Sequence, residues 1–62
     1  MCESNAYVVR DGKEELVMES VDVLRPEGDE VYLESIFGEQ KRLKAHIKEL
    51  RLVDHRIILE SR

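Results

Sequence analysis

The 62-residue sequence predicts an all-β protein, a small and strongly bent barrel or sandwich of five or six short strands. Turn-forming residues recur at regular intervals, as DGK at 11–13, PEGD at 26–29 and GEQ at 38–40. The segments between them have strand length and carry alternating or β-branched apolar residues. The two hairpins that these turns define follow each other without a crossover helix, which favours a strand over a helix for the segment that comes next.

The first predicted hairpin joins residues 6–10, AYVVR, to residues 14–25, EELVMESVDVLR. The Asp11–Gly12 pair between them is a strong signal for a tight hairpin, because both central positions of such a turn need a positive φ. Within 14–25 the apolar positions change parity around Glu19–Ser20, from Leu16 and Met18 to Val21 and Val23. A strand that changes its inward face in this way predicts a β-bulge or a sharp bend.

The second half of the chain is less uniform in pattern. Residues 30–37, EVYLESIF, alternate as a strand. In residues 41–53, KRLKAHIKELRLV, the apolar positions fit both a strand (Leu43, Ala45, Ile47) and a helix (Leu43, Ile47, Leu50, Val53). We expect a strand to about Lys48, then a bend or one short helical turn near residues 49–55, and a last strand over residues 56–60.

The length predicts a single domain, residues 1–62, near the lower limit for independent folding. Domains of this size often add a disulfide, a metal or a second subunit to a small core. The only cysteine is Cys2, so an intrachain disulfide is excluded. A metal or a partner subunit remains as the additional source of stability, unless the core alone is enough to stabilise the fold. Neither a transmembrane run nor a signal-peptide pattern is present, so we expect a cytoplasmic protein without membrane contact.

Charge is distributed unevenly along the chain. Residues 1–40 contain eleven carboxylates and three basic residues, whereas residues 41–62 contain seven basic and three acidic residues. A basic stripe runs through the second half, comprising Lys41, Arg42, Lys44, Lys48 and Arg51. No aromatic residue interleaves with the stripe and the whole chain has a net charge of −4, so nucleic acid is not the expected partner. Complementary solvent faces on neighbouring strands explain the asymmetry more simply.

Catalysis has little support in the sequence. There is no glycine-rich phosphate loop and no nucleophile-elbow pattern. Cys2 could pair with His46 or His55, but no third group is indicated that would orient the histidine. His46 shares a face with basic residues, and His55 is expected to form a local hydrogen bond with Asp54. No two ligands stand at zinc-finger spacing. We therefore expect a protein that is not an enzyme.

Cys2 stands beside the amino terminus, where its thiolate can act together with a nitrogen donor. If Met1 is removed, the Cys2 amine and thiolate close a five-membered chelate ring on one metal ion. If Met1 is retained, its terminal amine, the Cys2 amide nitrogen and the thiolate form two fused rings. Nitrogen and soft sulfur suit square-planar Ni²⁺, and also copper or zinc. The alternative is that Cys2 is an inert minor core residue, although chain ends are usually the least packed part of a domain.

One chain offers too few donors to close such a site. A two-fold dimer with adjacent termini would supply two sulfur and two nitrogen atoms. The chemistry of the residues therefore leaves two hypotheses, a metal site shared by two chains and a small binding module in which Cys2 is incidental.

The sequence also resembles the CooT-type small nickel-binding proteins associated with maturation of carbon monoxide dehydrogenase. The residues that carry the resemblance span nearly the whole chain: MCE and NAY at the start, DGKEELVME, VDVLRPEGDEVYL, IFGEQK and LVDHRIILE. The resemblance implies an Sm/SH3-like β-barrel, a homodimer, and Ni²⁺ binding that depends on Cys2. Its association with enzyme maturation implies a metallochaperone that supplies nickel to a client enzyme. The chelate chemistry adds Met1 as a donor through its terminal amine if that residue is retained. The alternative function is a small-barrel module that binds RNA or protein.

Overall fold

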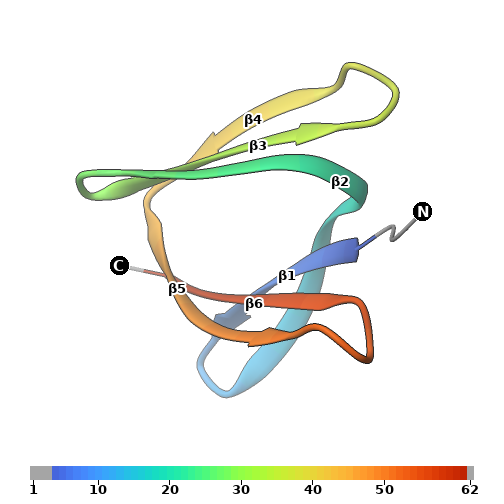
Figure 1. Ribbon diagram of the computed structural model, residues 1–62. Coiled ribbons are helices and arrows are strands. Elements are labelled where there is room, and N and C mark those ends of the chain that lie inside the picture. The colour runs from blue at the N-terminus through green and yellow to red at the C-terminus, as the bar shows by residue number, and fades with distance from the viewer. Residues whose placement is uncertain (1–3, 62) are drawn as a thin grey trace.

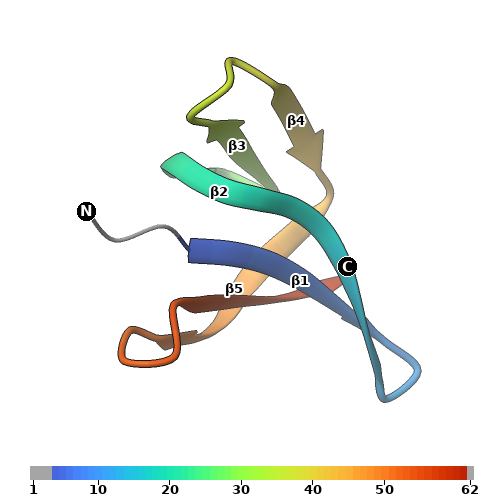
Figure 2. The same ribbon diagram turned by 90° about the vertical axis from the view of Figure 1, so that its right-hand side faces the viewer.

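The computed structural model describes residues 4–61, which form one strongly curled sheet of six strands (Figure 1). The strands are β1 (Ser4–Arg10), β2 (Lys13–Glu27), β3 (Glu30–Ser35), β4 (Gln40–Leu43), β5 (Ala45–Arg51) and β6 (Arg56–Ser61). Their order across the sheet is β4-β3-β2-β1-β6-β5. The sheet curls into a half-barrel, which confirms the prediction of a small, strongly bent all-β fold (Figures 1 and 2).

The pairing of the strands is antiparallel except at one joint. β1 pairs with β2, β2 with β3, β3 with β4, and β5 with β6, all in antiparallel fashion. β1 and β6 run parallel, with Ala6 opposite Ile57 and Val8 opposite Leu59. The first and last strands of the chain are therefore neighbours near the middle of the sheet.

The β1–β2 hairpin and the bulge in β2 are both confirmed. Asp11 and Gly12 have φ values of 51° and 77°, as the predicted hairpin turn requires. Ser4 pairs with Val21 and Ala6 with Met18, so two residues of β2, Glu19 and Ser20, oppose the single residue between Ser4 and Ala6. Ser20 itself has a φ of 54°. This bulge restores the inward orientation of Val21 after Met18 and bends β2 across the half-barrel.

Of the two alternatives predicted near residues 49–55, a bend or one short helical turn, the helical turn is wrong and the bend is confirmed. β5 continues to Arg51, and residues 52–55 form a turn in which the His55 amide donates to the Leu52 carbonyl at 3.3 Å. Within residues 4–61 the chain forms no helix. The reason is cross-strand pairing, because Leu50 lies opposite Ile57 and Arg51 opposite Arg56 in the β5–β6 ladder. These ladder bonds satisfy the backbone groups that a helix would otherwise pair locally.

The stretch expected as one strand over residues 41–48 is divided into two. β4 ends at Leu43 and β5 begins at Ala45, with a bend at Lys44 between them. The two strands lie at opposite edges of the sheet, so this bend carries the chain from one edge to the other. β3 likewise ends at Ser35, and Ile36 belongs to the following turn rather than to the strand.

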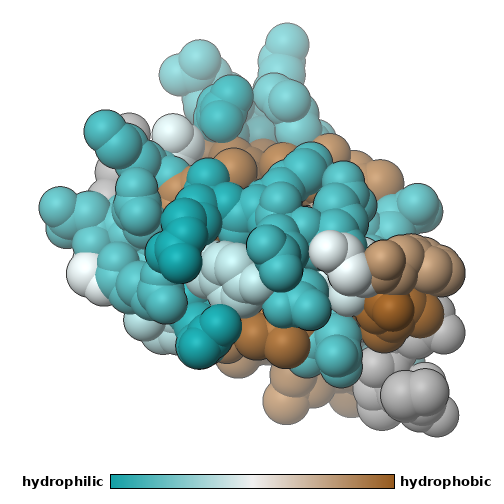
Figure 3. Space-filling model, turned by 90° about the horizontal axis from the view of Figure 1, so that it is seen from above, coloured by the Kyte–Doolittle hydropathy of each residue, from teal (hydrophilic) through white to brown (hydrophobic). Residues whose placement is uncertain are grey.

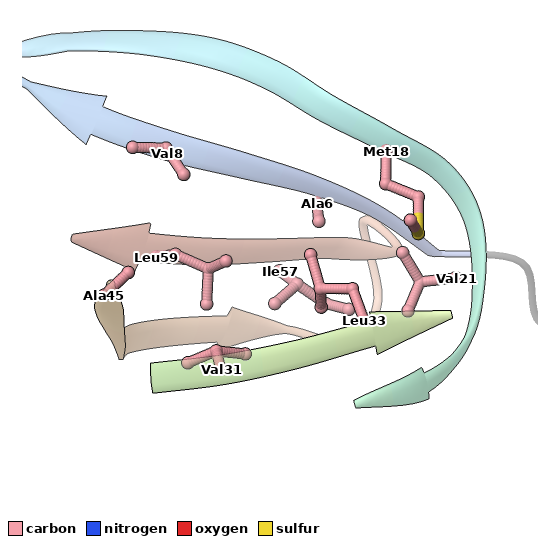
Figure 4. Packing of buried hydrophobic residues seen from close by; sticks show 9 residues of the cluster. All are labelled: Ala6, Val8, Met18, Val21, Val31, Leu33, Ala45, Ile57 and Leu59. Atoms are coloured by element: carbon pink, nitrogen blue, oxygen red, sulfur yellow. The ribbon is translucent and has the colours of Figure 1, made fainter. Parts of the chain in front are cut away.

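The core fills the concave side of the half-barrel with side chains from five of the strands (Figure 4). Leu33 and Leu59 are completely buried and lie near its centre. Aliphatic residues of β1, β2, β3, β5 and β6 complete the cluster: Ala6, Val8, Met18, Val21, Val31, Ala45 and Ile57. Because one curled sheet supplies all of these side chains, the core forms without a second layer.

Candidate metal centre at the amino-terminal end

Cys2 and Met1, the predicted metal-binding residues, lie outside the described residues, and the nearest described strand is β1. β1 begins at Ser4, and the backbone of Asn5 is fixed on both sides. Its amide donates to the His55 carbonyl at 2.9 Å, and its side-chain Oδ1 accepts from the Ser20 amide at 3.2 Å. Cys2 is two residues before Ser4, and an extended chain covers about 7 Å over that distance.

A chain of hydrogen bonds extends from this point around one end of the half-barrel. Besides the two bonds of Asn5, the Ser20 carbonyl accepts from the Ile36 amide at 2.9 Å, and the Leu52 carbonyl accepts from the His55 amide. The bonds therefore connect the start of β1, the β2 bulge, the β3–β4 turn and the β5–β6 turn. Figures 1 and 2 both show these two turns at the same end of the molecule as the start of β1.

The β3–β4 turn is held in a defined shape by Ser35, a polar residue that is only 3% exposed. Its Oγ accepts from the amides of Phe37 and Glu39, at 3.1 Å each. Its amide donates to the Glu39 carbonyl at 2.8 Å, and its carbonyl accepts from Gly38 at 3.0 Å. These hydrogen bonds fix the backbone of the turn, which carries the exposed apolar side chains of Ile36 and Phe37.

The two histidines occupy different surroundings. Nε2 of His46 lies 3.0 Å from Oε1 of Glu60, in a cross-strand pair between β5 and β6. His55 lies in the β5–β6 turn with a φ of 56°, and its backbone carbonyl is the acceptor for Asn5. The sequence pattern correctly placed His46 on a partly exposed face, but it did not reveal Glu60 as its partner. The contacts of His55 described here involve its backbone, whereas a bond to Asp54 was predicted.

The basic stripe is largely engaged with the chain's own acceptors. Arg42 pairs with Glu27, Arg51 Nε lies 3.2 Å from Glu49 Oε1, and Lys41 Nζ donates to the Val17 carbonyl at 2.6 Å. The Arg42–Glu27 pair joins the basic second half of the chain to the acidic first half. Complementary solvent faces on neighbouring strands stay a prediction, since β3 lies between β4, which carries Arg42, and β2, which carries Glu27.

Cations also stack on both tyrosines. The guanidinium groups of Arg25 and Arg42 lie 4.9 and 5.2 Å from the ring centre of Tyr32, which is buried between β2 and β4. The Tyr32 hydroxyl donates to Glu34 Oε1 at 2.7 Å, and this hydrogen bond, reinforced by desolvation, raises the pKa of Tyr32. The other tyrosine, Tyr7, lies 4.3 Å beneath the Arg56 guanidinium. These groups stabilise the outer surface of the sheet.

Within residues 4–61 no group of three or more His, Cys, Asp or Glu side chains is placed to hold a metal ion. In the same part of the chain no helix is long and apolar enough to cross a membrane. A metal site of the kind predicted from the sequence would therefore need donors from residues 1–3.

Comparison with known proteins identifies the family. The family model described as CO dehydrogenase accessory protein CooT matches residues 1–60. A crystal structure of a CooT candidate from Carboxydothermus hydrogenoformans is 52% identical, covers 98% of each chain and superimposes with a TM-score of 0.90. An uncharacterised protein of Methanocaldococcus jannaschii is 35% identical over 61 residues, which are 98% of this chain and all of the relative. The chain therefore belongs to the CooT family of CO dehydrogenase accessory proteins.

Proposed function

We propose that this protein is a homodimeric nickel carrier that supplies Ni²⁺ during maturation of carbon monoxide dehydrogenase. The observation that carries the proposal is the family match, which starts at residue 1 and so includes the only cysteine of the chain. The family description names an accessory protein rather than a catalyst. An accessory protein for a nickel enzyme needs a site that takes up the metal and releases it again.

The donor set at the amino terminus fits this task. A Cys2 thiolate and a terminal nitrogen form chelate rings of five members, and this combination suits Ni²⁺. The nitrogen is the amine of Cys2 if Met1 is removed, and the amine of Met1 together with the Cys2 amide if Met1 is retained. Two chains with adjacent termini would offer two thiolates and two amines to one ion. Thiols and amines must lose protons to bind, so nickel affinity should increase with pH.

The fixed start of β1 supports the same proposal. Asn5 is anchored to both the β5–β6 turn and the β2 bulge, and only two residues separate it from Cys2 in the sequence. A tether of about 10 Å confines the ligands to one end of the molecule. Such a position leaves the ion accessible to the ligands of an acceptor protein, which release by ligand exchange requires.

Nickel titration of the Cys2→Ser variant tests the proposal. An alcohol stays protonated near neutral pH and is a much weaker ligand for Ni²⁺ than a thiolate, so high-affinity binding and thiolate charge-transfer absorption should both disappear. Ser4→Ala is the matched control, since it alters a neighbouring residue without removing a soft donor. Acetylation of the terminal amine in a protein that retains Cys2 should weaken binding as well.

Unchanged nickel affinity in a folded Cys2→Ser protein would refute the proposed site. A binding module for RNA or protein, in which Cys2 is incidental, would then be the better explanation. Native mass spectrometry of the same samples would give the number of chains per ion and the state of Met1.

A further inference from the structure

The Asn5 side chain forms a hydrogen bond that joins the start of β1 to the bulge in β2. Its Oδ1 accepts from the Ser20 amide at 3.2 Å, and Ser20 has a φ of 54°. Residues other than glycine adopt this left-handed conformation at a cost, so it persists only where the surrounding structure holds it. The bulge interrupts the regular register of the β1–β2 ladder. The Asn5 carboxamide therefore supplies an acceptor at the point where the ladder is irregular.

A second bond of Asn5 runs to the other side of β1. The Asn5 amide donates to the His55 carbonyl in the β5–β6 turn at 2.9 Å. Asn5 thus connects the start of β1 to β2 on one side and to the turn that precedes β6 on the other. Substitution of the Asn5 side chain removes only the bond to Ser20 and leaves the backbone bond to His55 in place.

The apolar side chains of the neighbouring turns add little packing at this end of β1. The exposed fraction is 82% for Phe37 in the β3–β4 turn and 91% for Val53 in the β5–β6 turn. Figure 3 shows apolar atoms at the surface on the side of the β3–β4 turn. Segments with few buried apolar contacts open most readily. The hydrogen bonds of Asn5 therefore matter more here than ladder bonds do in the middle of the sheet.

We propose that Asn5 is a positioning residue of the nickel site, because its bond to the β2 bulge orders the start of β1 before the metal binds. The inference rests on the proposed function, in which Cys2, three residues before Asn5, is a ligand. Any residue that has to be ordered when the metal binds lowers the affinity by its loss of conformational entropy. Asn5 does not contact the ion in this role. It reduces the ordering that binding requires.

Nickel titration of Asn5→Ala and Asn5→Asp tests the inference, with a coloured chelator as the competitor for the metal. Asn5→Ala removes the acceptor for the Ser20 amide, so nickel affinity should fall about tenfold, which corresponds to ordering about one additional residue. Asn5→Asp retains an oxygen at the same place in the side chain, so it should restore the wild-type affinity. The titrations are carried out in concentrated salt, which screens the charge that aspartate adds.

Two further measurements separate a positioning role from a ligand role. At saturating nickel, Asn5→Ala should show the thiolate charge-transfer absorption of the wild type, because the ligands are unchanged, whereas Cys2→Ser should show none. In the metal-free protein, hydrogen exchange of the Ser20 amide should be faster in Asn5→Ala than in the wild type. Native mass spectrometry gives the number of chains in each sample, so that affinities are compared between equal assemblies.

Ser35→Ala is the matched control. It also removes a side-chain oxygen that accepts from backbone amides, those of Phe37 and Glu39. The loss falls in the β3–β4 turn and not at the start of β1, so this variant should lose stability but keep the wild-type nickel affinity. Should Asn5→Ala fail to fold, Asn5→Val takes its place, since valine favours a strand and offers no acceptor.

Wild-type affinity in folded Asn5→Ala would overturn the inference, and so would unchanged exchange of the Ser20 amide. An equal loss of affinity in Ser35→Ala would overturn it as well, because nickel binding would then follow general stability. The same holds for an altered spectrum at saturation, or for a loss of affinity that accompanies a change in the number of chains. Each of these results leaves the proposed function intact if binding depends on Cys2. Nickel binding that is unchanged in Cys2→Ser would overturn the proposed function, and the role of Asn5 with it.

Discussion

Truncating Leu33 to alanine should unfold much of the protein, whereas the same substitution at Leu16 should have little effect. Leu33 is completely buried at the centre of the core, and Leu16 is 49% exposed. A buried Leu→Ala change removes apolar burial and leaves a cavity, at a cost of about 2–5 kcal/mol. At Leu16 about half of the side chain is already in water and solvent fills the vacated space, so the loss should be about 1 kcal/mol.

The size of the domain makes this difference decisive. At roughly 0.05–0.15 kcal/mol per residue, a chain of this length has a free energy of unfolding of about 3–9 kcal/mol. Leu33→Ala therefore removes a large fraction of it, and urea denaturation followed by far-ultraviolet circular dichroism at one fixed protein concentration would measure the loss. A fixed concentration is needed because the proposed dimer would add to the apparent stability. Equal losses at Leu33 and Leu16 would refute the assignment of the core.

Three further predictions concern the outer surface. In a Tyr7→Phe protein, alkaline titration of phenolate absorption should give a pKa for Tyr32 above the ordinary value of 10.0, because Glu34 and desolvation favour the neutral phenol. The stability that this contact contributes is complete below about pH 10 and is lost as the pH rises through the raised pKa. A Tyr32 pKa at or below 10.0 would contradict this prediction. Gly12→Val should destabilise the hairpin by about 1–3 kcal/mol in thermal denaturation, since Gly12 has a φ of 77°; an unchanged melting temperature would refute this. His46→Ala should retain nickel affinity within about tenfold by calorimetry, because His46 pairs with Glu60 instead; complete loss would make His46 a ligand.

The sequence pattern predicted the first half of the fold better than the second. The Asp11–Gly12 turn and the bulge at Glu19–Ser20 are local features, and each leaves its own mark in the chain. In residues 41–53 the helical spacing was misleading because it depended on Leu50 and Val53. These residues are 47% and 91% exposed, so they do not belong to the face that packs on the core.

The candidate metal-binding residues could be predicted from the chemistry of the sequence. The structure that surrounds the start of β1 could not be predicted in this way. A single cysteine beside the terminal amine indicates a chelate whatever the fold is. By contrast, the hydrogen bonds that join Asn5 to Ser20 and His55 connect residues far apart in sequence through the sheet topology. The cluster of apolar turns around the start of β1 depends on that same topology. The ligand geometry at Cys2 itself stays a prediction, since Cys2 lies outside residues 4–61.

The parallel joint between β1 and β6 has a consequence for how the protein is made. Of the six strands described within residues 4–61, β1 is synthesised first and β6 last, yet β6 lies between β1 and β5 in the sheet. The half-barrel therefore cannot be completed until β6 has been synthesised and is free to pair. A nascent chain that stops before Arg56 would lose β6 and, with it, the strand that holds β5 in place. Pairing of Arg56–Ser61 with β1 on one side and with β5 on the other is thus the step that completes the sheet.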